Sequence, residues 1–208
     1  MVHDNQPSSV RKTDEMRSLT PSRIFPRVVH RHYFDLPGVP DVAVEPKRFG
    51  FVRSLGNDLI SFLAYSGDRT IRNIHQEHLD RLGLSLDEAN KIAIENVRRI
   101  AFDGTTIKQL VTKTNNGNDW AVWLGNDFTS SCLLLPDLYS WSQKHLNADS
   151  FLVRAASTQM VFVLQYKNRG DLARFDRYIS KVLEGSNNLV SPDWFVLTRD
   201  SLTPLGKQ

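Results

Sequence analysis

The chain has 208 residues, of which 40% are hydrophobic and 24% are charged, and its formal net charge is +3 at pH 7. These are ordinary values for a globular protein with a full hydrophobic core. No apolar run approaches the roughly 18 residues of a membrane-spanning helix, and the N-terminus lacks the apolar segment of a secretory signal. The single cysteine, Cys132, excludes an intramolecular disulfide. We therefore expect a cytoplasmic protein that does not span a membrane.

The N-terminal part of the sequence combines a polar tail with a basic segment. Residues 1–19 show no hydrophobic periodicity and are expected to form a flexible tail. Thr20 and Pro21 have the pattern of a helix start, and apolar residues at helical spacing predict a helix that ends before the turn at residues 36–40. Six cations in this part are compatible with a solvated helix face or with a nucleic-acid patch. They are Arg11, Lys12, Arg17, Arg23, Arg27 and Arg31.

Strand patterns come next, followed by two helices. Residues 42–44 predict a short edge strand, and the apolar run at residues 59–65 predicts a buried strand with a hairpin partner at residues 70–74. A short helix is predicted at residues 75–82, with Gly83 as its C-cap. The clearest helix covers residues 85–101, because Ser85 and Glu88 form a capping box before an apolar stripe. Its polar face carries Asp87 and Glu95.

The second half alternates hairpins and helices. The turn at Asn116 and Gly117 predicts a hairpin of residues 106–114 and 119–124, and Pro136 opens a helix. Other elements are predicted from apolar runs and amphipathic spacing. They are strands at residues 128–135, 151–155, 160–166 and 194–197, the third of them a central strand, and a helix at residues 171–183.

Hairpins mixed with helices predict an α+β fold. We expect an antiparallel or mixed sheet built from hairpins and packed against several amphipathic helices. Residues 20–208 would form a single domain, within which residues 20–83 are a candidate N-terminal subdomain.

Two groups of residues raise the question of catalysis. His75 and His78, three positions apart on a predicted helix, could bind zinc with a third ligand, but a solvated helix face accounts for them as well. Cys132 could be a nucleophile beside a histidine, or a small buried residue. The sequence contains no phosphate-binding loop, dinucleotide motif or calcium-loop series. It therefore predicts neither a cofactor nor a metal, and it favours a protein that is not an enzyme.

Trp120 and Trp123 lie on opposite faces of a predicted strand. One face should pack on the core, and the other must be covered by a second layer or by a partner. Tryptophan is enriched at interaction hot spots, so either residue is an interface candidate, but the pattern favours burial of both, because a helix layer on each face would suffice.

Four segments resemble, in the same order, the YtpQ-like family of uncharacterised bacterial proteins. They are LGLSLDEANKIAIENV (82–97), WLGNDFTSSCLLLPDLY (123–139), FLVRA (151–155) and LVSPDWFVL (189–197), and the resemblance extends over residues 79–202 with a core at 84–202. Family members typically carry a Pro-Arg-Asp turn where this chain has Ala-Ser-Thr-Gln at residues 156–159, so no role of that turn is carried over. The resemblance implies an α+β fold and a cytoplasmic bacterial protein.

These observations favour a non-catalytic protein-binding protein, an immunity-type or inhibitory partner that masks the surface of a toxin or an enzyme. A homodimer is compatible with the sequence. Two alternatives stay open: nucleic-acid association through the basic N-terminal segment, and an enzyme that uses Cys132 or the pair of His75 and His78. The residues expected to contact a protein partner are Asp87, Glu95, Asn116, Asp119, Trp120 and Trp123.

Overall fold

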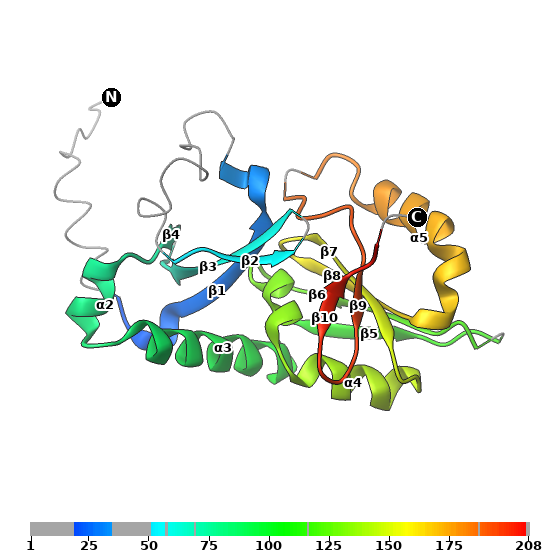
Figure 1. Ribbon diagram of the computed structural model, residues 1–208, viewed down its shortest axis with the longest axis horizontal. Coiled ribbons are helices and arrows are strands. Elements are labelled where there is room, and N and C mark those ends of the chain that lie inside the picture. The colour runs from blue at the N-terminus through cyan, green and yellow to red at the C-terminus, as the bar shows by residue number, and fades with distance from the viewer. Residues whose placement is uncertain are drawn as a thin grey trace, which may run out of the picture.

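Two antiparallel sheets dominate the computed structural model of the protein, which describes residues 19–34, 51–56, 58–68, 70–115, 117–186 and 188–206 (Figure 1). In sheet A the central strand is β3, which pairs with β1 along one edge and with β2 and β4 along the other. The predicted hairpin of β3 and β4 is confirmed. The strands of sheet A are β1 (Ile24–His30), β2 (Arg53–Gly56), β3 (Leu59–Ser66) and β4 (Ile71–Asn73).

Sheet B has six strands in the order β10-β9-β7-β8-β6-β5, and all of its pairings are antiparallel. The Asn-Gly hairpin is confirmed as the pair of β5 and β6, and β8 is central, as its apolar sequence predicts. Sequence patterns missed β10, which is short and pairs only with β9. The strands are β5 (Lys108–Thr112), β6 (Trp120–Leu124), β7 (Phe151–Ser157), β8 (Met160–Gln165), β9 (Phe195–Leu197) and β10 (Leu202–Pro204).

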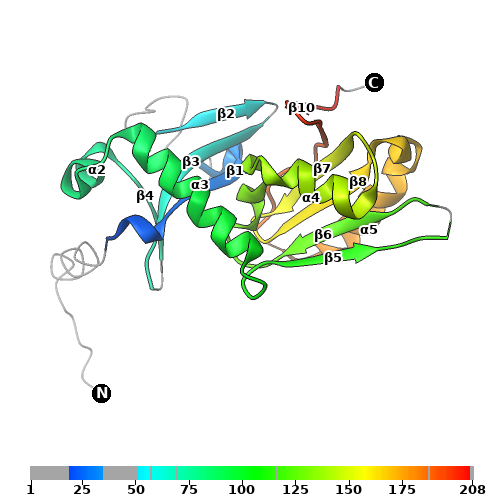
Figure 2. The ribbon, with the colours of Figure 1, turned by 90° about the horizontal axis from the view of Figure 1, so that it is seen from below.

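Helices cover both faces of sheet B and one face of sheet A (Figure 2). Helix α5 packs on one face of sheet B, and α4 and η4 pack on the other face, toward sheet A. The α+β prediction is therefore confirmed. The helices are η1 (Pro21–Arg23), η2 (Arg31–Phe34), α2 (Gln76–Leu82), α3 (Leu86–Phe102), η4 (Thr129–Leu134), α4 (Asp137–Leu146), η5 (Tyr166–Asp171) and α5 (Leu172–Val182).

Helix α3 connects the two halves of the fold and begins as predicted. The side chain of Ser85 accepts a hydrogen bond from the Glu88 amide at 3.3 Å, and the Glu88 carboxylate accepts one from the Ser85 amide at 2.8 Å. Small buried residues such as Ala89 and Ala93 let the helix approach sheet A closely. Toward its C-terminal end, Val97 joins a continuous core that contains residues of both sheets.

The helix predicted after Thr20 is wrong, because only the short turn η1 forms there and the chain then enters β1. Apolar pairs at 24, 25, 28 and 29 suit a helix face, but they equally suit a strand that is buried on both faces. The β-branched residues favour the strand, and Pro26 is tolerated because β1 lies at the edge of sheet A. The strand predicted at residues 42–44 and nearly all of the predicted tail lie outside the described residues.

The strand predicted at residues 128–135 is also wrong, because η4 forms instead. The hydroxyl of Ser130 donates to the carbonyl of Val28 at 2.9 Å, and that of Ser131 donates to Pro26 at 2.6 Å. These bonds satisfy carbonyl groups on the outer edge of β1. The Ser130 amide donates a hydrogen bond to the carbonyl of Thr158, in the turn between β7 and β8, at 2.9 Å. η4 is therefore hydrogen-bonded both to sheet A and to a turn of sheet B.

A second contact between the sheets requires a glycine. Gly56, at the end of β2, has φ +95°, and a Cβ atom there would lie 2.8 Å from Cγ of Pro204 in β10. Both the backbone conformation and the close approach exclude a larger side chain. None of the helices in the described segments is long and apolar enough to cross a membrane.

Candidate binding groove and histidine pocket

A groove of about 940 Å³ lies between α3 and sheet A. Its floor contains Phe62 and Leu63 of β3, and its helical wall contains Leu86 and Ile94 of α3. Leu133 and Leu134 of η4 and Leu202 of β10 extend the apolar lining. Charged side chains of both signs join this lining, namely Arg53 of β2 and Asp87 and Lys91 of α3.

The local sequence explains why a groove remains here. Helix α3 contacts sheet A through alanines, while its larger residues Leu86 and Ile94 are only half-buried on the flank of the helix. On the sheet side, β2 has only four residues, and the small side chain of Ser61 lines the groove. Apolar walls with a few polar groups are typical of ligand sites, and open apolar grooves accept amphipathic segments of other proteins.

The two acidic residues predicted on α3 have different surroundings. Asp87 lines the groove and is exposed. Glu95 forms an ion pair with Arg98, whose Nε also donates to the Asp137 carboxylate of α4 at 2.7 Å. Glu95 therefore belongs to a network that connects α3 with α4.

The remaining predicted contact residues lie around sheet B. The Asp119 carboxylate accepts hydrogen bonds from Lys113 at 2.8 Å and from the Thr114 amide at 2.9 Å, and Lys113 is the main cause of its lowered pKa. Trp120 is half-buried, with Phe162, Phe175 and Tyr178 around its ring.

Trp123 is fully buried between Phe102 and Trp141, so its prediction as an interface residue is wrong for the folded chain. The two tryptophans occupy opposite faces of β6, as predicted, and helical layers cover both. Asn116 lies outside the described residues. The structure therefore does not gather the predicted contact residues on one surface.

The basic N-terminal segment does not form the predicted helix face. Arg23 donates to Asp68 at 2.8 Å, Arg27 donates to the Tyr33 hydroxyl at 2.9 Å, and Arg31 donates to Asp58 at 3.0 Å. Because β1 separates Arg23 from Arg31, these cations lie at opposite ends of an extended strand. The other three cations, Arg11, Lys12 and Arg17, lie outside the described residues.

The candidate catalytic groups have structural roles. Cys132 is fully buried in the main core, and burial raises the pKa of its thiol. Nδ1 of His78 accepts a hydrogen bond from the His75 amide at 3.0 Å, which leaves that nitrogen engaged at the start of α2. Burial, followed by the neighbouring His78, lowers the pKa of His75. No group of three histidine, cysteine or acidic side chains that could hold a metal occurs in the described part of the chain.

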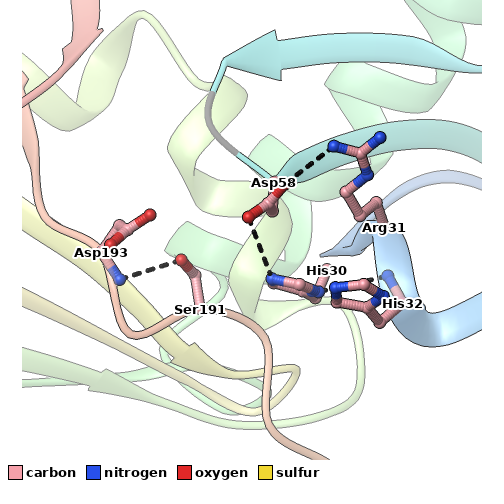
Figure 3. Close-up of polar contacts among 6 residues, drawn as sticks. All are labelled: His30, Arg31, His32, Asp58, Ser191 and Asp193. Carbon is pink, nitrogen blue, oxygen red and sulfur yellow. Dashed lines mark hydrogen bonds and ion pairs between the residues drawn. The ribbon is translucent and has the colours of Figure 1, made fainter.

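A second pocket, of about 420 Å³, lies where the end of β1 approaches sheet B. We call it the histidine pocket. The rings of His30 and His32 stack with centroids 4.7 Å apart, and Nε2 of His30 lies 3.8 Å from the Asp58 carboxylate (Figure 3). Burial, followed by the neighbouring His32, lowers the pKa of His30. The lining residues are His30, His32, Tyr33, Arg154, Ala156, Leu189, Val190, Ser191 and Pro192.

Ser191, His30 and Asp58 are residue types found in hydrolase triads, but their hydrogen bonds differ from that arrangement. Nδ1 of His30 accepts from the His32 amide at 3.1 Å, and the Ser191 hydroxyl accepts from the Asp193 amide at 3.0 Å (Figure 3). A triad histidine needs one nitrogen free to take the proton of the serine and the other held by a carboxylate. Nδ1 of His30 is occupied by the hydrogen bond from the His32 amide and is not free to take the serine proton. These three residues therefore do not form a hydrolase triad.

Sequence reasoning missed the histidine pocket, because its residues come from β1, η2, β7 and the segment before β9. Comparison with known proteins adds no further guide to function: no family model, curated protein or solved structure matches the chain.

Proposed function

We propose that the protein is a non-catalytic cytoplasmic binding protein, an immunity-type or inhibitory partner that neutralises a toxin or an enzyme by masking its surface. The observation that carries this proposal is the groove between α3 and sheet A. Its occupant is an amphipathic segment of the partner protein.

The lining of the groove supports a protein segment as the occupant. An amphipathic helix buries one apolar face in such a groove and keeps its charged face in water. Arg53, Lys91 and Asp87 supply both signs of charge, so the partner segment should carry acidic and basic residues beside its apolar face. The volume of about 940 Å³ lies at the upper end of the range of roughly 300–1,000 Å³ for small-molecule sites.

The surroundings of Cys132 and of the two serines before it support binding over catalysis. Ser130 and Ser131 donate their hydroxyl hydrogens to backbone carbonyls of β1, and the Cys132 thiol is enclosed by the core. A nucleophile must reach the substrate and a base, which these positions prevent in the folded chain.

A matched pair of variants tests the proposal. Ile94→Asp places a charge on the apolar wall of the groove, whereas Leu110→Asp makes the same type of change at an exposed residue of β5. Each variant and the wild-type chain are used to capture proteins from the native host, and the affinity of any identified partner is then measured by calorimetry.

We expect one partner to bind the wild-type chain and Leu110→Asp equally and to bind Ile94→Asp at least about tenfold more weakly, a difference of ~1.4 kcal/mol. Circular dichroism checks that both variants are folded. A partner that binds all three chains alike, or a wild-type chain that emerges alone at every salt concentration, would rule out the groove as the contact surface.

A further inference from the structure

The histidine pocket contains a buried guanidinium with unused hydrogen-bonding capacity. Arg154 of β7 is only 7% exposed, and its Nε donates to the Ser191 carbonyl at 2.9 Å. Its Nη1 donates to the Asp176 carboxylate of α5 at 2.8 Å. The third nitrogen, Nη2, has no hydrogen-bond partner among the described residues and is not fully enclosed. A buried arginine held on two sides presents its remaining N–H groups in a fixed direction.

His30 supplies a second donor at the same pocket. Its Nδ1 accepts a hydrogen bond from the His32 amide, so the neutral ring must carry its hydrogen on Nε2. The nearest carboxylate oxygen, on Asp58, is 3.8 Å from Nε2, which is too far for a hydrogen bond. The Nε2 hydrogen therefore remains available to an acceptor that enters the pocket.

The lining of the pocket combines flat rings with aliphatic side chains. The flat rings are those of His30 and His32, which stack, and that of Tyr33. Val190 and Pro192 also line the pocket, and Leu189 is 60% exposed. The volume of about 420 Å³ lies near the lower end of the range of roughly 300–1,000 Å³ for small-molecule sites, so the ligand must be small.

Three carboxylates lie around the pocket, and two of them are paired with cations. Asp176 is paired with Arg154, and Asp58 is paired with Arg31, so neither carboxylate is without a cation. Asp193 interacts electrostatically with both His30 and Arg154 and opposes an anion there. An anion is therefore held by local hydrogen bonds and not by net charge, and the two oxygens of a carboxylate can accept from two donors at once, Nη2 of Arg154 and Nε2 of His30.

We propose that the histidine pocket binds a small molecule that has one carboxylate on a flat, apolar body. The carboxylate accepts hydrogen bonds from Nη2 of Arg154 and Nε2 of His30, and the body lies between the stacked histidine rings and Pro192. This site is separate from the groove, and its binding does not depend on the function proposed for the groove.

Benzoate, benzamide and inorganic phosphate separate the features of this ligand. Benzoate has the flat body and the charge, benzamide has the body alone, and phosphate has the charge alone. Binding to the full chain is followed by calorimetry and by the ring proton signals of the histidines in NMR spectra. We expect saturable one-to-one binding of benzoate that shifts the signals of His30 and His32, and at least about tenfold weaker binding of both other compounds.

Three variants locate the site. Arg154→Met removes the guanidinium but leaves Asp176 unpaired, so Leu189→Asp, at an exposed position, provides a second variant that leaves the buried ion pair intact. Both should weaken benzoate binding at least about tenfold, because one removes the anion partner and the other adds a negative charge. His145→Ala, on α4 and outside the pocket, should leave the affinity unchanged.

Several results would overturn the proposal. If benzamide bound as tightly as benzoate, the charge would not contribute to binding. If phosphate bound as tightly as benzoate, the flat body would not contribute. Unchanged benzoate affinity in Leu189→Asp, or no saturable binding of benzoate to the folded wild-type chain, would exclude the pocket as a carboxylate site.

Discussion

Asn96 on α3 shows how one buried polar side chain fixes the path of the backbone. Its amide nitrogen donates to the carbonyl of Pro21 at 2.8 Å and to that of Ile24 at 2.8 Å, where the chain leaves η1 and enters β1. With the hydroxyls of Ser130 and Ser131, it satisfies carbonyls along the edge of the strand that has no neighbouring strand among the described residues. Buried carbonyls without such partners would destabilise the fold.

Replacing Asn96 by Ala should therefore lower the free energy of unfolding by about 1–3 kcal/mol, since the buried carbonyl of Ile24 loses its donor, whereas the Pro21 carbonyl keeps a hydrogen bond from the Ile24 amide. Urea denaturation measures the change. Asn90→Ala, at an exposed position of the same helix, serves as the control and should change the free energy by less than about 0.5 kcal/mol. Equal effects at the two positions would contradict the role given to Asn96.

The ionised carboxylate of Asp103, which follows α3, contributes to the stability of the folded chain, and this contribution is lost in acid. Its carboxylate accepts hydrogen bonds from the amides of Thr105 and Thr106, both at 2.8 Å, and from the Thr106 hydroxyl at 2.5 Å. The Thr106 hydroxyl is the largest cause of the lowered pKa, which falls from 3.8 to about 2. The ionised form is therefore favoured in the folded chain.

Because the folded pKa lies below the unfolded one, this stabilisation is present above pH 3.8 and is lost as the pH falls toward 2. We expect the melting temperature of the wild-type chain to fall more steeply across that window than that of Asp103→Asn. NMR of the carboxyl carbon should give a midpoint of about 2 for Asp103. A midpoint near the ordinary value would show that the turn does not hold the ionised carboxylate.

Local sequence signals correctly predicted those helices and turns that depend on residues close in sequence. The capping box and apolar stripe of α3, the Gly83 cap of α2 and the Asn-Gly hairpin all depend on residues close in sequence, and each was predicted correctly. β1 was predicted as a helix and η4 as a strand, because the structure of each segment depends on its contact with the other. The hydroxyls of η4 satisfy the edge of β1, and no local pattern in either segment specifies that pairing.

The N-terminal cap of α3 should have a measurable effect on stability. Ser85→Ala removes the side chain that accepts the Glu88 amide, and such a loss typically lowers the free energy of unfolding by about 1 kcal/mol. Thermal or urea unfolding measures the change. Ser180→Ala, at an exposed position within α5, should have no destabilising effect, because alanine is the better helix former there. Destabilisation of the same size at both sites would exclude a special contribution from the cap.

For the whole molecule, the important contacts are those between the two sheets. The main hydrophobic core contains Phe25 and Phe62 of sheet A together with Trp123 and Val153 of sheet B. η4 donates hydrogen bonds to both sides of this boundary. We therefore expect sheet A and sheet B to unfold together.

The positions of the tryptophans allow this expectation to be tested. Trp120, Trp123, Trp141 and Trp194 all lie in the half of the chain that builds sheet B. Their fluorescence should change at the same urea concentration at which the amide protons of β3 lose protection from exchange. Two separate transitions would show that sheet A is an independent unit, as a candidate subdomain of residues 20–83 would require.

The two cavities were less accessible to sequence reasoning than the elements that surround them. Of the residues that line the groove, only Asp87 was predicted to contact a partner, because its exposure at a helix start follows from local pattern. The histidine pocket combines β1, predicted as a helix, with Arg154 and residues 189–192, so its geometry depends on a strand pairing that the sequence did not reveal.

The contact of Gly56 with Pro204 also makes the shape of the groove depend on both sheets. Most of the groove is encoded before residue 140, yet Leu202 contributes to its lining and Pro204 packs against the end of β2. The groove therefore has its final shape only when β10 is in place, so loss of β10 from sheet B would open the groove at one end.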